Sequence, residues 1–124
     1  GRRTLNEAEA KEVMLAYGVP ALPSIPCRTM EAAVQAAQQA GFPVAVKLLS
    51  SIVTHKSDVG GVVLGLSDEA AVCAAFDAIR GRVTQAAGPE AFEGVTVQPM
   101  IKDRGFELIV GSSTDPQLGP VLLF

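Results

Sequence analysis

The stretch Val44-Ala-Val-Lys47, followed by His55-Lys-Ser-Asp-Val-Gly-Gly-Val62, decides the fold of this 124-residue chain. It places a lysine inside an apolar strand, and then a basic loop that leads into a second apolar strand. A charged amine is costly to hold in apolar surroundings unless an anion or a carboxylate meets it. Gly60 and Gly61 carry no Cβ, so the backbone there can approach a bound group closely. The stretch therefore predicts a hairpin that grips phosphate.

The composition of the chain restricts the class of protein. Hydrophobic residues make up 48% and charged residues 19%, which is typical of one globular domain over residues 1–124. The net charge of −3 argues against a general nucleic-acid binder. No apolar run approaches the ~20 residues that span a bilayer, and the first residues carry no signal-peptide pattern. Cys27 and Cys73 lie outside any CxxC or Cys/His cluster, which favours a cytoplasmic protein.

Three segments have the pattern of helices. Asn6 and Glu9 form a capping box that predicts the first helix. Thr29 predicts the start of a second helix, which runs to Ala40 and is rich in alanine. Ser67, followed by two acidic residues, predicts the start of a third helix.

The remaining apolar segments have the pattern of strands. Residues 22–27 form a short extended piece after the first helix. Residues 42–49 and 62–66 form the first pair, 94–101 and 105–111 form a hairpin, and 119–124 form the last strand. The predicted order is α-β-α-β-β-α-β-β-β. It indicates an α+β fold with a mixed or antiparallel sheet and about three helices packed on it. The chain stops within apolar sequence, so we expect a fragment of a longer protein.

The residues of the opening stretch have two interpretations each. Lys47 is either a point charge for phosphate oxygens or a lysine that snorkels from an edge strand. The loop from His55 to Gly61 is either a phosphate-covering loop or a tight turn with solvated side chains. It is not a P-loop, because no GxxxxGK[ST] pattern occurs. His55 suits proton or phosphoryl transfer, although a lone histidine is often solvated, and it lacks partners for a metal site.

A second group of candidates follows later in the chain. Pro99 cannot donate to a strand ladder, so Gln98–Met100 suits a sheet edge where free backbone groups can read a base. A methionine such as Met100 is more often a core residue than one that faces a ligand. Glu107 is placed to accept ribose hydroxyls or to pair with Lys47, and a solvated sheet face is the alternative.

Together these segments resemble the ATP-grasp domain of the nucleoside-diphosphate-forming acyl-CoA synthetases, relatives of succinyl-CoA ligase. The resemblance covers nearly the whole chain and is most specific at HKSDVGGV, ELIVG and DPQLGPV. The segments that carry it are 9–20, 41–47, 55–62, 97–100, 106–111 and 115–121.

The resemblance implies that the chain is the N-terminal ATP-grasp subdomain. The implied ATP-binding residues are Lys47, Lys56, Gly60, Gly61, Val62, Gln98, Pro99, Met100 and Glu107. Lys47 would contact the phosphates under the glycine loop, Gln98–Met100 the adenine and Glu107 the ribose. His55 falls where this branch has a histidine thought to relay the phosphoryl group to a histidine of the CoA-binding part.

The resemblance also implies what the chain lacks. The second half of the nucleotide cleft and the Mg²⁺ ligands would lie beyond residue 124, so we expect the isolated chain to be inactive and to bind ATP weakly. CoA-binding domains would follow in the same chain or in a partner subunit. The implied parent is an ADP-forming acyl-CoA ligase whose acyl substrate stays open. The alternative is a regulatory module fused to a protein lysine N-acetyltransferase.

Overall fold

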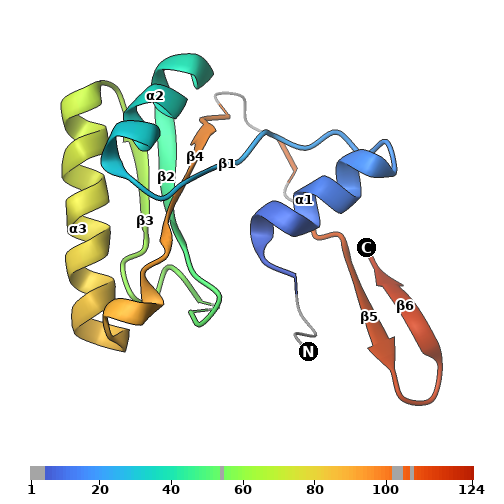
Figure 1. Ribbon diagram of the computed structural model, residues 1–124. Helices are drawn as coiled ribbons and strands as arrows, with labels where there is room; N and C mark the ends of the chain where they lie inside the picture. The colour runs from blue at the N-terminus through green and yellow to red at the C-terminus, as the bar shows by residue number, and fades with distance from the viewer. Residues whose placement is uncertain (1–4, 54, 102–104, 107) are drawn as a thin grey trace.

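The computed structural model describes residues 5–53, 55–101, 105–106 and 108–124. Figure 1 shows the arrangement of its helices and strands. Their bounds are α1 Glu7–Ala16, β1 Ile25–Cys27, α2 Met30–Ala40, β2 Val44–Leu49, β3 Val62–Leu66, α3 Glu69–Ala87, the 3₁₀ turn η1 Pro89–Ala91, β4 Gly94–Pro99, β5 Gly111–Asp115 and β6 Gly119–Leu123. The α+β class is therefore confirmed.

The sheets are antiparallel throughout the described residues. Four strands form the main sheet in the order β1-β4-β2-β3, and β5 pairs with β6 in a separate two-stranded sheet. Helices α2 and α3 lie side by side against one face of the main sheet (Figure 1). The order of the main sheet makes β2 an interior strand, and β2 carries Lys47.

Local hydrogen bonds explain where the helices begin. The backbone N–H of Glu9 donates to the side chain of Asn6 at 3.0 Å, and the N–H of Asn6 donates to the carboxylate of Glu9 at 2.8 Å, so the predicted capping box is present. Thr29 caps α2 as predicted. The cap of α3 is Asp68 and not Ser67, because the Asp68 carboxylate accepts the N–H of Ala71 at 2.8 Å.

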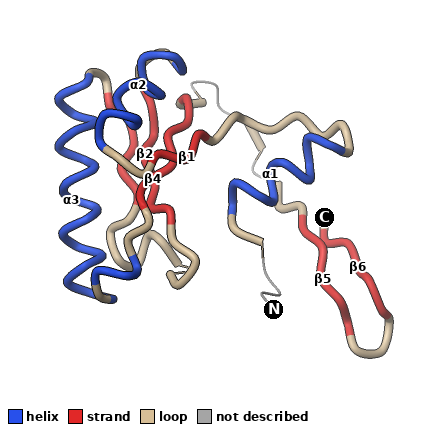
Figure 2. Tube along the Cα trace, in the orientation of Figure 1, coloured by secondary structure: helices blue, strands red, loops and turns tan. Residues whose placement is uncertain are grey.

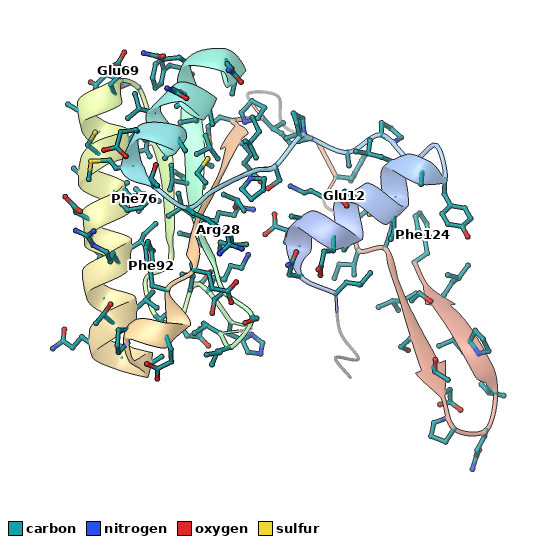
Figure 3. The ribbon with its side chains drawn as sticks, in the orientation of Figure 1. Glu12, Arg28, Glu69, Phe76, Phe92 and Phe124 are labelled. Carbon is teal, nitrogen blue, oxygen red and sulfur yellow. The ribbon has the colours of Figure 1, made fainter. Side chains whose placement is uncertain are left out.

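The hydrophobic core lies between the main sheet and the pair α2 and α3. The rings of Phe76 and Phe92, labelled in Figure 3, meet edge to face with centroids 5.4 Å apart. The buried residues of α2 are all alanines, which lets the helix approach the sheet closely. The core residues on the strands and α3 include Val44, Val46, Leu48, Val72, Ile79, Val83, Val95 and Val97.

The predicted hairpin of residues 94–101 and 105–111 is wrong. Residues 105–106 and 108–110 form no strand, and Phe106 is 98% exposed. Alternation favours a strand only where a neighbouring strand or a covering layer is present, and the described part of this segment has neither. The hairpin that forms is β5–β6, closed at Asp115, whose carboxylate accepts the N–H groups of residues 117 and 118. The turn predicted at 102–104 lies outside the described residues.

Helix α1 and the β5–β6 hairpin lie apart from the layered body (Figures 1 and 2). None of the residues of α1, all of which are described, is buried, and none belongs to the core cluster. Two helices rather than three therefore pack on the main sheet. No helix in the described ranges is both long and apolar enough to cross a membrane.

Candidate functional site

Lys47 lies on an interior strand and points away from the core. Val46 and Leu48 on either side of it belong to the core, so the alternation along β2 turns the lysine to the opposite face. Because β2 lies between β4 and β3, the interpretation of Lys47 as an edge-strand lysine is wrong. Thr96 is paired directly across from it on β4, and its buried hydroxyl has no hydrogen-bond partner among the described residues.

The residue that meets Lys47 is Glu7, which the sequence analysis did not single out. One oxygen of the Glu7 carboxylate is 3.0 Å from the Lys47 Nζ and 3.2 Å from the Lys11 Nζ. The other oxygen is 3.5 Å from the Lys56 Nζ. Three amines from α1, β2 and the following loop thus converge on a single carboxylate.

The electrostatics of this cluster favour a charged Glu7. Burial raises the pKa of the Glu7 carboxyl, but hydrogen bonds from Lys47 and Lys11 and the nearby charge of Lys56 outweigh burial and lower the pKa to about 2. Glu7 is also in the first turn of α1, where the helix dipole favours a negative charge. The cluster therefore has the chemistry of an anion site that is filled by the protein's own carboxylate.

The loop after β2 is built from its own backbone hydrogen bonds. The N–H of Gly61 donates to the carbonyl of Lys56 at 2.7 Å, and the N–H of Gly60 donates to the carbonyl of Ser57 at 3.1 Å. A Cβ at position 61 would lie 2.8 Å from the Lys56 carbonyl oxygen and 2.9 Å from the Leu48 Cβ. Gly60 has φ +64°, where a side chain is strained. The turn itself therefore requires both glycines, and their role above phosphates stays a prediction.

A cavity of about 870 Å³ opens beside this cluster. Four of the predicted site residues line it: Lys47, His55, Lys56 and Val62. Glu7 lines it too. Gly60 and Gly61 are in the loop next to it but do not line it. The structure thus brings the basic residues and the lone histidine of the opening stretch to one hollow.

Serines that the sequence analysis overlooked shape the wall of the same cavity. Ser50 and Ser51 both line it. The Ser50 hydroxyl accepts the N–H groups of residues 52 and 53, and the Ser51 N–H donates to the Glu93 carboxylate at 2.6 Å. A serine directly after a buried strand is a turn signal that could have indicated this arrangement.

Of the predicted adenine-binding residues, Gln98 and Pro99 end β4, and Met100 follows that strand. Gln98 is paired with Ala45 on β2, and its side chain accepts a hydrogen bond from the Lys11 Nζ at 3.0 Å. The Met100 N–H donates to the Pro43 carbonyl at 3.2 Å, so this N–H is already used. None of Gln98–Met100 lines the cavity. Glu107 lies outside the described residues, and its predicted contact with the ribose stays a prediction.

Comparison with known proteins gives this geometry a context. A family model described as an ATP-grasp domain matches residues 1–124. The chain is 38% identical over 122 residues to a 4-hydroxybutyrate–CoA ligase (ADP-forming) of Nitrosopumilus maritimus, a match that covers 98% of this chain and 17% of the relative. It is 34% identical over 124 residues to the beta subunit of an acetate–CoA ligase (ADP-forming) II of Pyrococcus furiosus, covering 100% of this chain and 52% of the subunit.

A solved structure also resembles the chain. The dinucleotide forming acetyl-coenzyme A synthetase 1 of Ca. Korarchaeum cryptofilum, in complex with coenzyme A, Ca-AMPCP and HgCl⁺, has a TM-score of 0.89 and 39% sequence identity. The match covers 98% of this chain and 53% of that chain. The chain therefore spans between a sixth and about half of the proteins that it matches. Because the family model covers every residue, the chain belongs to the ATP-grasp domain family.

Proposed function

We propose that this chain is the N-terminal ATP-grasp subdomain of an ADP-forming acyl-CoA synthetase and that it binds the phosphates of ATP. The observation that carries the proposal is the convergence of the Lys47 and Lys56 amines on one carboxylate, beside His55, in a single cavity. Two ammonium groups held on a rigid strand and its loop form a suitable receptor for a polyphosphate. Membership of the ATP-grasp family and the similarity to ADP-forming ligases support the same assignment.

The parent reaction would exchange acyl-CoA, ADP and phosphate for the acid, CoA and ATP. In this reaction His55 would accept a phosphoryl group on a ring nitrogen as the bond to the donor breaks, and would then pass the group on. Its position on the same cavity as Lys47 and Lys56 supports this role. The two lysines would stabilise the negative charge of the phosphoryl group during transfer.

Other parts of the site are proposed to lie outside this chain. From the resemblance to the acyl-CoA synthetases, we place the Mg²⁺ ligands beyond residue 124, in the second ATP-grasp subdomain. We place the CoA-binding domains in the same chain or in a partner subunit. Without these parts, we expect residues 1–124 alone to bind ATP weakly and to be inactive.

The relatives limit what is proposed about substrate and context. They carry different acids in their names, so no single acyl group is assigned to this chain. Their names are those of ligases and do not favour the acetyltransferase alternative. We place the protein in the cytoplasm, where two free cysteines, one of them buried in the core, persist as thiols.

The proposed function is tested by ATP formation. The full-length protein is mixed with ADP, phosphate and either acetyl-CoA or 4-hydroxybutyryl-CoA, and ATP is measured with luciferase. We expect ATP to form with at least one of these acyl-CoA probes. His55→Asn is expected to lower the rate about 100-fold, because a residue that carries the transferred group has been removed. ATP affinity, measured by calorimetry, is expected to stay unchanged in this variant.

Two results would contradict this account in different ways. Absence of ATP formation with both acyl-CoA probes would argue against the synthetase reaction. A full rate in His55→Asn would leave the synthetase reaction in place but would remove His55 from the phosphoryl relay.

A further inference from the structure

Helix α1 is attached to the main sheet through ionic and polar contacts. None of its residues, which are described without a gap, belongs to the hydrophobic core or packs against it. Among the described residues, its contacts with the sheet and its loop include those of Glu7 with Lys47 and Lys56, and that of Lys11 with Gln98. Its position therefore depends in part on the same two amines that the proposed function assigns to phosphate.

The Glu7 carboxylate lies where an anionic ligand of these amines would lie. The side chains of Lys47 and Lys56 are only 22% and 16% exposed, and Glu7 takes up a hydrogen-bonding direction of each amine that phosphate oxygens in the adjoining cavity would otherwise use. The low pKa of Glu7 supports this geometry, since a carboxylate with a pKa of about 2 is charged and held by its partners at neutral pH.

We propose that Glu7 competes with the phosphates of the nucleotide for Lys47 and Lys56, so that α1 docks on the empty site and is released when ATP binds. This inference rests on the proposed function, because it takes ATP as the ligand of the two lysines. Glu7 acts as a tethered counterion that keeps the lysines paired in the absence of the nucleotide, and α1 is the element that moves.

The energetics of this exchange follow from charge and linkage. A triphosphate carries several negative charges and can replace a single carboxylate at both amines. The apparent association constant for ATP is the intrinsic constant multiplied by the fraction of molecules in which α1 is undocked. Linkage is reciprocal, so an ATP molecule that competes with Glu7 must in turn weaken the docking of α1. Docking of α1 thus orders the site in the absence of nucleotide and lowers its affinity for ATP.

The experiment compares ATP binding by the full-length protein and by Glu7→Gln, measured by calorimetry. Removing the charge of Glu7 is expected to tighten ATP binding about tenfold, the gain expected if α1 is docked about 90% of the time. Glu12→Gln is the matched control, because Glu12 is an exposed carboxylate on the same helix and is labelled in Figure 3. The control is expected to leave ATP affinity unchanged.

Hydrogen exchange on the wild-type protein gives a second test that needs no variant. We expect ATP to speed the exchange of the backbone amides of residues 7–16, because the helix loses its docking contacts and frays. The amides of α2 are an internal reference, since α2 packs in the core, and their exchange is not expected to change.

Each other result would overturn the inference. ATP affinity that is unchanged or weaker in Glu7→Gln, or slower exchange of α1 with ATP, would show that Glu7 does not compete with the nucleotide. An equal gain in Glu12→Gln would show a general effect of charge. A folded wild-type protein that does not bind ATP would overturn the proposed function, and the inference with it.

Discussion

Replacing Lys47 with alanine is expected to weaken ATP binding by the full-length protein by about 3 kcal/mol, or about 150-fold in the dissociation constant. Lys47 lines the cavity from an interior strand, and the residues paired with it on the two neighbouring strands, Val62 and Thr96, carry no charge that could replace it. Removing one partner of a largely buried ion pair costs several kcal/mol, because the remaining charge is left uncompensated. In Lys47→Ala, the phosphate that Lys47 contacts would be the charge left without its partner. Calorimetric titration with ATP measures the change.

A matched control removes one positive charge from the other side of the sheet. Arg80 is exposed on α3 and pairs with Asp77, away from the cavity. Arg80→Ala is expected to leave the dissociation constant for ATP within about twofold of the wild type. Arg80 is exposed and does not line the cavity, so salt screens its charge from a bound phosphate. ATP affinity that survives Lys47→Ala, or that falls equally in both variants, would contradict the assignment of Lys47 to phosphate.

Gly94→Ala is expected to destabilise the fold by about 4 kcal/mol, through backbone strain combined with overpacking. Gly94 begins β4 with φ +134°, and a Cβ there would lie 2.3 Å from the Cys27 carbonyl oxygen and 2.9 Å from the Arg28 Cα. These atoms belong to the backbone of β1 and the residue that follows it, so the clash cannot be relieved by a side-chain rotation. The loss is measured as a lower midpoint of chemical unfolding, followed by circular dichroism.

Gly81→Ala is the control for this prediction. Gly81 is exposed within α3, and a Cβ there would meet no atom within 4 Å beyond the helix itself. Alanine has the higher helix propensity, so this variant is expected to gain about 0.5–1 kcal/mol. A Gly94→Ala variant as stable as the wild type would contradict the close approach of β4 to β1 in this structure.

Local signals in the sequence predicted most of the fold. Asn6 and Thr29 begin helices because their side chains can accept backbone N–H groups, and this property is readable from residue type and spacing. The strand containing Lys47 was readable from its apolar run. The segment 105–111 was misassigned, because alternation does not reveal whether a partner strand is present.

The candidate site was predicted only in part. Lys47, His55 and Lys56 come together as the opening stretch indicates, since they are separated by a single loop. Glu7 could not be predicted, because its pairing with Lys47 spans 40 positions and depends on how α1 is placed in space. The glycines of the loop were correctly singled out, yet the structure shows that the turn needs them for its own hydrogen bonds.

A structure of the full-length protein with magnesium and a non-hydrolysable ATP analogue would test the central claim most directly. The account predicts a phosphate oxygen within about 3 Å of the Lys47 Nζ, a hydrogen-bond distance, and the Glu7 carboxylate displaced from it. An analogue bound elsewhere, with Lys47 still paired with Glu7, would contradict the account.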